Sequence, residues 1–223
     1  TPILDPLVTL GFIASKTSKI KLGTSIIVLP YRNPIILAKN FSTLDVLSNG
    51  RALCGIGAGW LEKEFEVLGV SYSDRGKITN EYLEKIKELW NEDKSSNLDY
   101  IFEPKPIQKP SIPIWVGGNS QLAIKRAVIY GQAWHPTRLT PKQVKDKLPY
   151  LKDLLSKFGK DTKSFSISLK RNLNFTDLKL PNINFQENPS SLSGTAYEIK
   201  KDIQYCKEIG IDQLTFDLST NNI

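Results

Sequence analysis

Hydrophobic positions along the chain follow two alternating periods. Short apolar runs of strand length are separated by segments in which apolar residues return every three or four positions. The short runs predict six strands, at residues 20–29, 52–57, 112–116, 133–135, 165–169 and 213–218. The longer segments predict amphipathic helices between them, including helices at 6–17, 61–68, 78–92 and 120–130.

Capping residues mark where several of these helices begin and end. Asn33 precedes Pro34, which is the typical order of a helix cap and the first helical residue. Two capping boxes, Thr140-Pro-Lys-Gln143 and Thr195-Ala-Tyr-Glu198, predict two further helix starts. Glycines at 50, 69, 131 and 210 follow the periodic segments and predict their ends.

Strands that alternate with helices predict a parallel sheet with helices on its outside. A doubly wound sheet and a (β/α)₈ barrel both fit this pattern, although six strands are two short of a closed barrel. Residues 93–111 form a long polar and proline-rich connection, after which the pattern resumes. Residues 172–193 have little periodicity, and we expect a mobile loop or lid there. We therefore expect a single domain over residues 1–223.

Composition is that of a globular protein, with 40% hydrophobic and 24% charged residues. The net charge of +7 is spread along helices and loops, so no clustered basic stripe predicts nucleic-acid binding. No apolar stretch approaches the roughly 18–20 residues that cross a bilayer. We expect a cytoplasmic protein with no membrane partner.

Histidine, cysteine and methionine limit the chemistry further. A single histidine, His135, excludes a multi-histidine metal centre within this sequence, and we expect no metal. Cys54 and Cys206 lack ligand spacing and are expected to be buried, reduced thiols. Because the sequence contains no methionine, we expect that Thr1 is not the biological start.

Two glycine-rich turns follow predicted strands and lead toward helices. They are Arg51-Ala-Leu-Cys-Gly-Ile-Gly-Ala-Gly-Trp60 and Ile112-Pro-Ile-Trp-Val-Gly-Gly-Asn-Ser120. Glycine lets backbone N–H groups approach a ligand, and the start of a helix favours an anion. The turns therefore predict a phosphorylated cofactor at strand ends. The spacing does not match the dinucleotide fingerprint, since the third glycine is misplaced.

The order of motifs resembles the luciferase-like monooxygenase family over nearly the whole chain, most closely its branch that uses coenzyme F420. The resemblance rests on these segments: Leu22-Gly-Thr-Ser-Ile26, Tyr31-Arg-Asn-Pro34, Leu37-Ala-Lys39, Thr43-Leu-Asp-Val-Leu-Ser48, Gly50-Arg51, Gly55-Ile-Gly-Ala-Gly-Trp60, Glu64-Phe65, Leu68-Gly69, Arg75-Gly76, Pro104-Lys-Pro106, Pro113-Ile-Trp-Val-Gly-Gly-Asn119 and Gly131-Gln-Ala-Trp-His-Pro136.

The resemblance implies an α/β fold of the (β/α)₈, or TIM barrel, type. It makes the present strands the third to the eighth, with the first two βα units absent from this chain. It further implies a flavoprotein-type oxidoreductase that transfers hydride between coenzyme F420 and a small organic substrate. The alternatives are an FMN-dependent monooxygenase that uses reduced flavin and oxygen, and a non-catalytic flavin-binding barrel. The implied partners are a flavin or F420 reductase and a second copy of the chain in a homodimer.

The resemblance also implies which residues hold the cofactor. We expect them in three turns and after one strand, as follows: Thr24, Ser25, Ile26, Gly57, Ala58, Gly59, Trp60, Gly117, Gly118, Asn119, Ser120, His135 and Thr137. Gly117 to Ser120 would form the phosphate cradle, and a cis peptide at Ser25–Ile26 would support the ring system. His135 is a weak candidate for a catalytic acid. Arg51, Asp45 and Arg75 are expected to be structural.

Overall fold

The computed structural model describes residues 4–91, 100–177 and 190–217. It consists of two compact units. The N-terminal unit is Leu4–Trp115, and the C-terminal unit begins at Val116 and includes the rest of the described chain. Both units are built from parallel strands and helices, as the alternating sequence pattern predicted.

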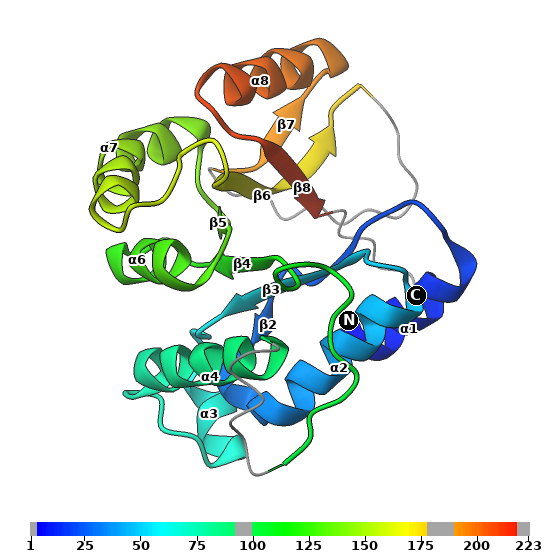
Figure 1. The fold of residues 1–223 in the computed structure, drawn as a ribbon. Helices are drawn as coiled ribbons and strands as arrows, with labels where there is room; N and C mark the ends of the chain where they lie inside the picture. Colours follow the sequence, from blue (N-terminus) through cyan, green and yellow to red (C-terminus); the bar gives the residue numbers. More distant parts are fainter. Residues whose placement is uncertain (1–3, 92–99, 178–189, 218–223) are drawn as a thin grey trace. The chain divides into compact units, whose positions relative to one another are not determined.

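The N-terminal unit contains two short strands that both pair in parallel with a third (Figure 1). Its elements are α1 (Pro6–Lys16), β1 (Leu22–Gly23), β2 (Ile27–Val28), the 3₁₀-helix η1 (Leu29–Tyr31), α2 (Pro34–Leu47), β3 (Ala52–Gly57), α3 (Glu62–Leu68) and α4 (Arg75–Trp90). Helix α2 packs against α1, α4 and β3. The core of the unit therefore lies between β3 and these helices.

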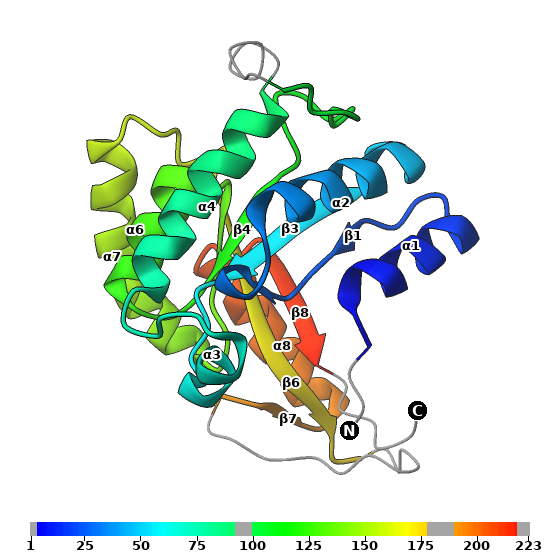
Figure 2. The same ribbon diagram turned by 90° about the horizontal axis from the view of Figure 1, so that it is seen from below.

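The C-terminal unit starts within β4 (Ile114–Gly117), whose last two residues belong to it. It continues with α6 (Gln121–Tyr130), β5 (Ala133–His135), α7 (Pro141–Lys157), β6 (Ser166–Phe175), β7 (Leu192–Gly194), α8 (Ala196–Glu208) and β8 (Gln213–Asp217). Strand β5 pairs in parallel with β6, which pairs in parallel with β7 and β8. Helices α6 and α7 lie side by side, and α8 packs on β7 (Figures 1 and 2).

Side-chain caps explain why three of the helices begin where they do. The Asn33 carboxamide accepts hydrogen bonds from the amides of Ile35 and Ile36, with Pro34 at the first helical position. Both capping boxes are present, and each satisfies two orphan amides reciprocally. The predicted starts of α2, α7 and α8 are confirmed.

The apolar run 20–29 is not one strand, and that prediction is wrong. The run forms β1 and β2, separated by residues 24–26, and ends in η1. The peptide between Ser25 and Ile26 is cis, as the resemblance implied. The Thr24 hydroxyl donates to the Gly55 carbonyl at 2.6 Å and accepts from the Gly55 amide at 3.1 Å. This side chain therefore replaces backbone pairing where the strand is interrupted.

The prediction of a loop over 172–193 is wrong at both of its ends. Strand β6 extends to Phe175, and β7 occupies Leu192–Gly194. Backbone pairing of Leu173, Asn174 and Phe175 with β7 holds this polar segment in the sheet. The rest of the expected lid, residues 178–189, lies outside the described residues.

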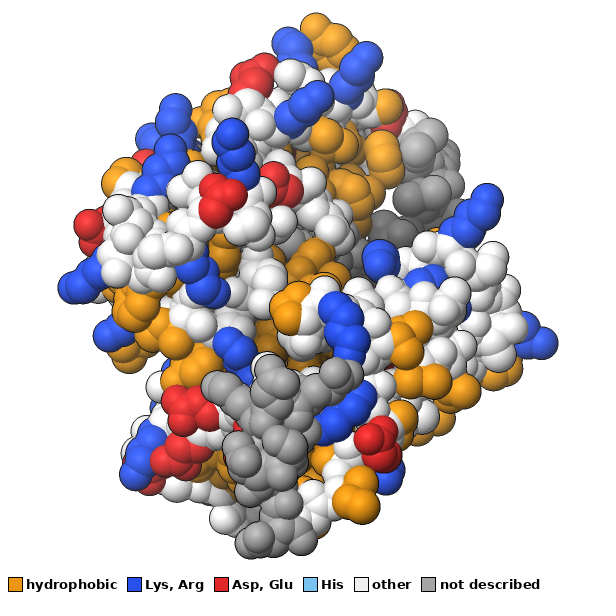
Figure 3. Space-filling model, viewed as in Figure 1, with side chains coloured by type: hydrophobic (Ala, Val, Ile, Leu, Met, Phe, Trp, Pro, Cys, Tyr) orange, Lys and Arg blue, Asp and Glu red, His pale blue; other side chains and the backbone are white. Residues whose placement is uncertain are grey.

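Leu44, Ile86 and Leu151 on the helices are buried, whereas Ile203 on α8 is 39% exposed. Cys54 and Cys206 are buried and free, as expected, and burial raises the pKa of Cys206 to about 12. No helix in the described part of the chain has the length and hydropathy of a membrane span. Lysines and acidic residues are interspersed on the face shown in Figure 3.

Arg51 joins the end of α1 to the start of β3. Its guanidinium donates to carbonyls of Ala14, Thr17, Ile20 and Ser48 and to the Thr17 hydroxyl, over 2.7 to 3.0 Å. A cation beside the last carbonyls of a helix also interacts favourably with the helix dipole. Asp45 similarly accepts from the amides of Ile107 and Gln108. Both residues hold backbone in place, which agrees with the structural roles expected for them.

We predict that Arg51→Met lowers the free energy of unfolding by about 3 kcal/mol, because it leaves several buried carbonyls without donors. The measurement is chemical denaturation of the wild type and the variant. Lys63→Met is the matched control, since Lys63 pairs with Glu66 in an exposed position and its loss should not change stability. Equal stability of Arg51→Met and the wild type would contradict the assigned role.

Candidate functional site

The turn between β4 and α6 is the first part of the candidate site. Gly117 is buried at the end of β4, Gly118 and Asn119 are half-buried, and Ser120 is exposed. Gly118 has a φ of 121°, and a Cβ there would lie 2.8 Å from the Ala123 Cβ. Both facts require glycine, because a side chain would push the turn away from the first turn of α6.

The N-terminus of α6 has unused backbone donors. The first four amides of an α-helix have no partner within the helix. Here the Ala123 amide donates to the Ser120 hydroxyl at 3.2 Å, and the Ile124 amide donates to the Ser120 carbonyl at 3.1 Å. Within residues 4–91, 100–177 and 190–217, no acceptor is found for the amides of Gln121 and Leu122. These two N–H groups are free to bind an anion.

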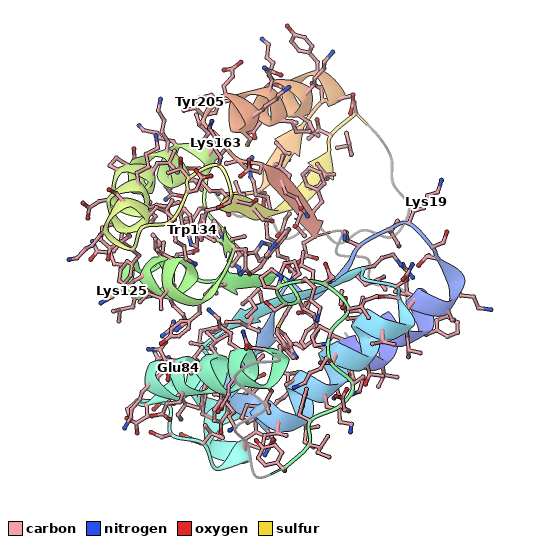
Figure 4. All side chains as sticks on the ribbon, viewed as in Figure 1. Lys19, Glu84, Lys125, Trp134, Lys163 and Tyr205 are labelled. Carbon is pink, nitrogen blue, oxygen red and sulfur yellow. The ribbon has the colours of Figure 1, made fainter. Side chains whose placement is uncertain are left out.

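Asn119 ties this turn to the segment after β5. Its side-chain amide donates to the Thr137 carbonyl at 2.8 Å, and its oxygen accepts from the Thr137 amide at 3.4 Å. The indole of Trp134, which Figure 4 shows at β5, donates to the Gly118 carbonyl at 2.8 Å. The structure therefore brings Gly118, Asn119 and Thr137 together, as expected for residues at neighbouring strand ends.

His135 is 2% exposed at the end of β5. Its Nδ1 lies 3.0 Å from the Ser168 hydroxyl on β6. Burial, with a smaller contribution from the nearby Lys170 charge, lowers the pKa of His135 to about 4. The imidazole is therefore neutral at pH 7, which suits a hydrogen-bonding role better than that of a proton donor.

Strands β5, β6 and β8 present a polar face beside His135. Side chains alternate along a strand, and the parallel register aligns His135 with Ser168, Lys170 with Thr215, and Asn172 with Asp217. The backbone bridge between Thr137 and Lys170 continues the register of β5 and β6. The described residues of this face include His135, Thr137, Ser168, Lys170, Asn172, Thr215 and Asp217. We call them the polar face.

The opposite side of these strands is apolar and packs on helices. Ile167 and Leu169 are buried there. Arg171, which is 4% exposed, forms an ion pair with Asp202 on α8 and donates to the carbonyls of Ser190 and Ser191. These partners explain why an arginine is buried at this position, so Arg171 is not part of the candidate site.

In the N-terminal unit, the Ile26 side chain lies against Gly57. A Cβ on Gly57 would lie 2.7 Å from the Ile26 Cδ1, and a Cβ on Gly55 would lie 1.8 Å from the Thr24 carbonyl oxygen. Thr24 is buried, Ile26 is half-buried and Ser25 is exposed. Packing thus explains Gly55 and Gly57 without a ligand, and Ser25 is the accessible residue of this turn.

The turn after β3 places Gly59 and Trp60 differently. Gly59 has a φ of 81°, and a Cβ would lie 2.7 Å from Val28 and 2.8 Å from Phe65. Ala58 is half-buried, whereas Trp60 is 74% exposed, and its carbonyl accepts from the Tyr72 hydroxyl. Packing against Val28 and Phe65 therefore explains Gly59, and Trp60 is the exposed side chain of residues 57–60.

Ser168, Lys170 and Asp217 were not recognised from the sequence as site residues. Their signal was available, since polar residues alternate with apolar ones at 166–170. In a parallel strand that is covered on both faces, an apolar run is the usual pattern. A polar row on such a strand indicates a face turned toward water or a ligand.

Comparison with known proteins gives a consistent family. A family model described as luciferase-like monooxygenase matches residues 1–177. An uncharacterized protein of Mycobacterium tuberculosis is 33% identical over 168 residues, covering 71% of this chain and 58% of that protein. The oxygenase component of a flavin-dependent trigonelline monooxygenase from Acinetobacter baylyi is 33% identical, covering 57% of this chain and 38% of that protein. An F420-dependent glucose-6-phosphate dehydrogenase from Amycolatopsis mediterranei is 29% identical, and the match covers 52% of this chain and 37% of that protein.

Solved structures show the same fold. An F420-dependent secondary alcohol dehydrogenase, in complex with an F420–acetone adduct, matches with a TM-score of 0.79 at 22% identity. The match covers 96% of this chain and 80% of that chain. The expected fold class, an α/β fold of the (β/α)₈ type, is confirmed. The chain spans 58% of the length of the mycobacterial relative.

We predict that His135 titrates with a midpoint near pH 4 in the folded protein. Because it is the only histidine, its imidazole Cε1–H signal in an NMR titration is unambiguous. A midpoint near 6.5, the ordinary value, would show that the ring is not desolvated as described.

The same shift predicts how stability depends on pH. The unfolded chain takes up a proton near pH 6.5, whereas the folded chain resists it down to about pH 4. The contribution of neutral His135 to the free energy of unfolding is therefore complete above pH 6.5. It is lost as the pH falls toward 4, which lowers the free energy of unfolding by roughly 3 kcal/mol. His135→Gln should remove this part of the slope in urea denaturation between pH 6.5 and 5. An unchanged slope would contradict the prediction.

Proposed function

The chain belongs to the luciferase-like monooxygenase family, and on that basis we propose that it is part of an oxidoreductase that transfers hydride between coenzyme F420 and a small organic substrate. The observation that carries this proposal is the pair of free amides at the start of α6. They follow a glycine turn at the end of a parallel strand, where barrel enzymes place their binding loops.

The residues present fit the phosphorylated part of such a cofactor. The amides of Gln121 and Leu122 have no acceptor among the residues that the structure describes, and they lie at the positive end of a helix dipole. Glycine at 118 keeps the turn close to α6, and Asn119 fixes the turn to Thr137. A phosphoryl group at this position would receive hydrogen bonds from backbone groups that are already held in place, so little entropy is lost on binding.

The bound deazaflavin would supply the hydride chemistry, and the protein would supply position and electrostatics. His135 would offer a neutral ring that is fixed by Ser168, and Thr137 would offer a hydroxyl at the next strand position. In the N-terminal unit, Ser25 and Trp60 are the exposed members of the other two cofactor segments. Gly57 and Gly59 would act by letting the backbone pack closely around them, and Ala58 between them is half-buried.

The second candidate is an FMN-dependent monooxygenase that receives reduced flavin from a reductase. It is favoured by the 33% identity with an oxygenase component, a name that implies a separate partner. The two candidates share the same requirement for a phosphate site. They differ in the reaction of the reduced cofactor with oxygen, and this difference separates them experimentally.

We predict that Gln121→Pro weakens the binding of coenzyme F420 to the full-length protein about tenfold, because one charge-assisted hydrogen bond is lost. Proline lacks the N–H group but is well tolerated at the first helical position. Ser120 precedes it with φ −77° and ψ 158°, a conformation that is compatible with a following proline. The measurement is calorimetric titration of the cofactor.

Gln121→Ala is the matched control, since it removes the side chain and keeps the amide. We expect it to bind as the wild type does, and we expect both variants to unfold at the wild-type temperature. Wild-type affinity in Gln121→Pro would place the phosphate elsewhere and contradict the cradle.

Oxygen uptake distinguishes the two cofactors. We predict that the full-length protein binds F420 about tenfold or more tightly than FMN, and that it adds no oxygen consumption to that of free reduced FMN. Calorimetry and an oxygen electrode give the two results. Oxygen uptake that depends on the protein and on reduced FMN would favour the monooxygenase. Absence of binding for both cofactors would contradict both candidates.

A further inference from the structure

Lys170 provides a positive charge on the polar face. Its ammonium lies 3.2 Å from the Asp217 carboxylate at the end of β8. The Lys170 side chain is 25% exposed, whereas the Asp217 side chain is 42% exposed. The cation is thus the more desolvated partner of the pair, and its carboxylate is the more accessible one.

In such an ion pair, another anion can readily replace the carboxylate beside the lysine. An ion pair whose acid is half-exposed contributes little to stability, because water can replace the cation around the carboxylate. The ammonium is the less exposed partner and keeps less hydration, so an uncompensated charge would cost more at Lys170 than at Asp217. Asp217 therefore occupies a position that an incoming carboxylate can take, while Asp217 itself turns to solvent.

Three of the described neighbours of Lys170 on this face are neutral hydrogen-bonding groups. Ser168 precedes it by two residues on β6, Thr215 is its register partner on β8, and Thr137 bridges to it from β5. His135 is within electrostatic range of the Lys170 ammonium and is held by Ser168. A cation among neutral donors and acceptors, near the carboxyl ends of parallel strands, is an arrangement suited to a small anionic molecule.

We propose that Lys170 is a substrate-binding residue and that the substrate carries a carboxylate, which replaces Asp217 against the Lys170 ammonium. The inference rests on the proposed function for the presence of a substrate site, and it adds the class of substrate. The free amides of α6 and the Lys170 ammonium then serve different anions, the first a cofactor phosphate and the second a substrate carboxylate.

The test uses benzoate as the probe and benzamide as its uncharged counterpart, with the full-length protein and no cofactor. The Cε1–H signal of His135, identified in the full-length protein by its loss in His135→Gln, reports binding, because the Lys170 charge acts on this ring. We expect benzoate to shift the signal saturably and benzamide to leave it unchanged. Lys170→Met should weaken benzoate binding about tenfold, and Lys170→Arg should retain it.

Asp217→Asn gives the sharpest result. If Asp217 competes with the ligand, its removal tightens benzoate binding by about threefold to tenfold. If the pair serves only to join β6 to β8, Asp217→Asn leaves binding unchanged or weakens it, and the proposal is overturned. Lys163→Met, an exposed lysine of the same unit that is labelled in Figure 4, is the control and should bind benzoate as the wild type does.

Two further outcomes would overturn the proposal. One is equal binding of benzamide and benzoate. The other is a combination of two results: Lys170→Met no longer binds F420 or FMN, and the His135 signal shifts with inorganic phosphate but not with benzoate. Together these results would assign Lys170 to the cofactor. Because benzoate is titrated without cofactor, its binding can be judged even if the protein fails to bind F420 or FMN. A failure of this proposal is therefore distinguishable from a failure of the proposed function.

Discussion

The parallel register of β5, β6 and β8 is the constraint on which the candidate site depends. Because alternate side chains point to opposite faces, one register places His135, Ser168 and Lys170 together. The same register turns Ile167, Leu169 and Arg171 toward the helices, where Arg171 pairs with Asp202. A shift of one residue would bury the polar row and expose the apolar one. Burial of one face thus fixes the position of every polar group on the other.

Glycine has a different role in each unit. In the N-terminal unit, a Cβ on Gly55, Gly57 or Gly59 would lie less than 3.0 Å from Thr24, Ile26 or Val28, respectively, in the segment that runs parallel to β3. Their spacing suggested a ligand, but packing of the interrupted strand accounts for it. In the C-terminal unit, Gly118 also has a packing cause, yet the turn that it permits leaves two helix amides unused. The proposed phosphate site therefore depends on these donors rather than on the glycines.

Local signals in the sequence predicted much of the fold. Asn33, Thr140 and Thr195 act through hydrogen bonds within three residues, so their effect is visible without tertiary structure. The ends of β6 and β7 depend on pairing between residues about 19 positions apart, which no local pattern reveals. The break at Ser25 and the pairing of Lys170 with Asp217 are likewise tertiary. The family resemblance implied the cis peptide at Ser25–Ile26 but not the break in the strand, and the pairing of Lys170 with Asp217 depends on the register of β6 and β8.

We propose two kinds of anion recognition for the C-terminal unit, one by backbone amides and one by a lysine ammonium. The most direct test is a crystal structure of the full-length protein with coenzyme F420 bound. The account predicts phosphoryl oxygens within about 3 Å of the amide nitrogens of Gln121 and Leu122. A phosphoryl group bound away from the start of α6, with these amides bonded to water or protein, would contradict it.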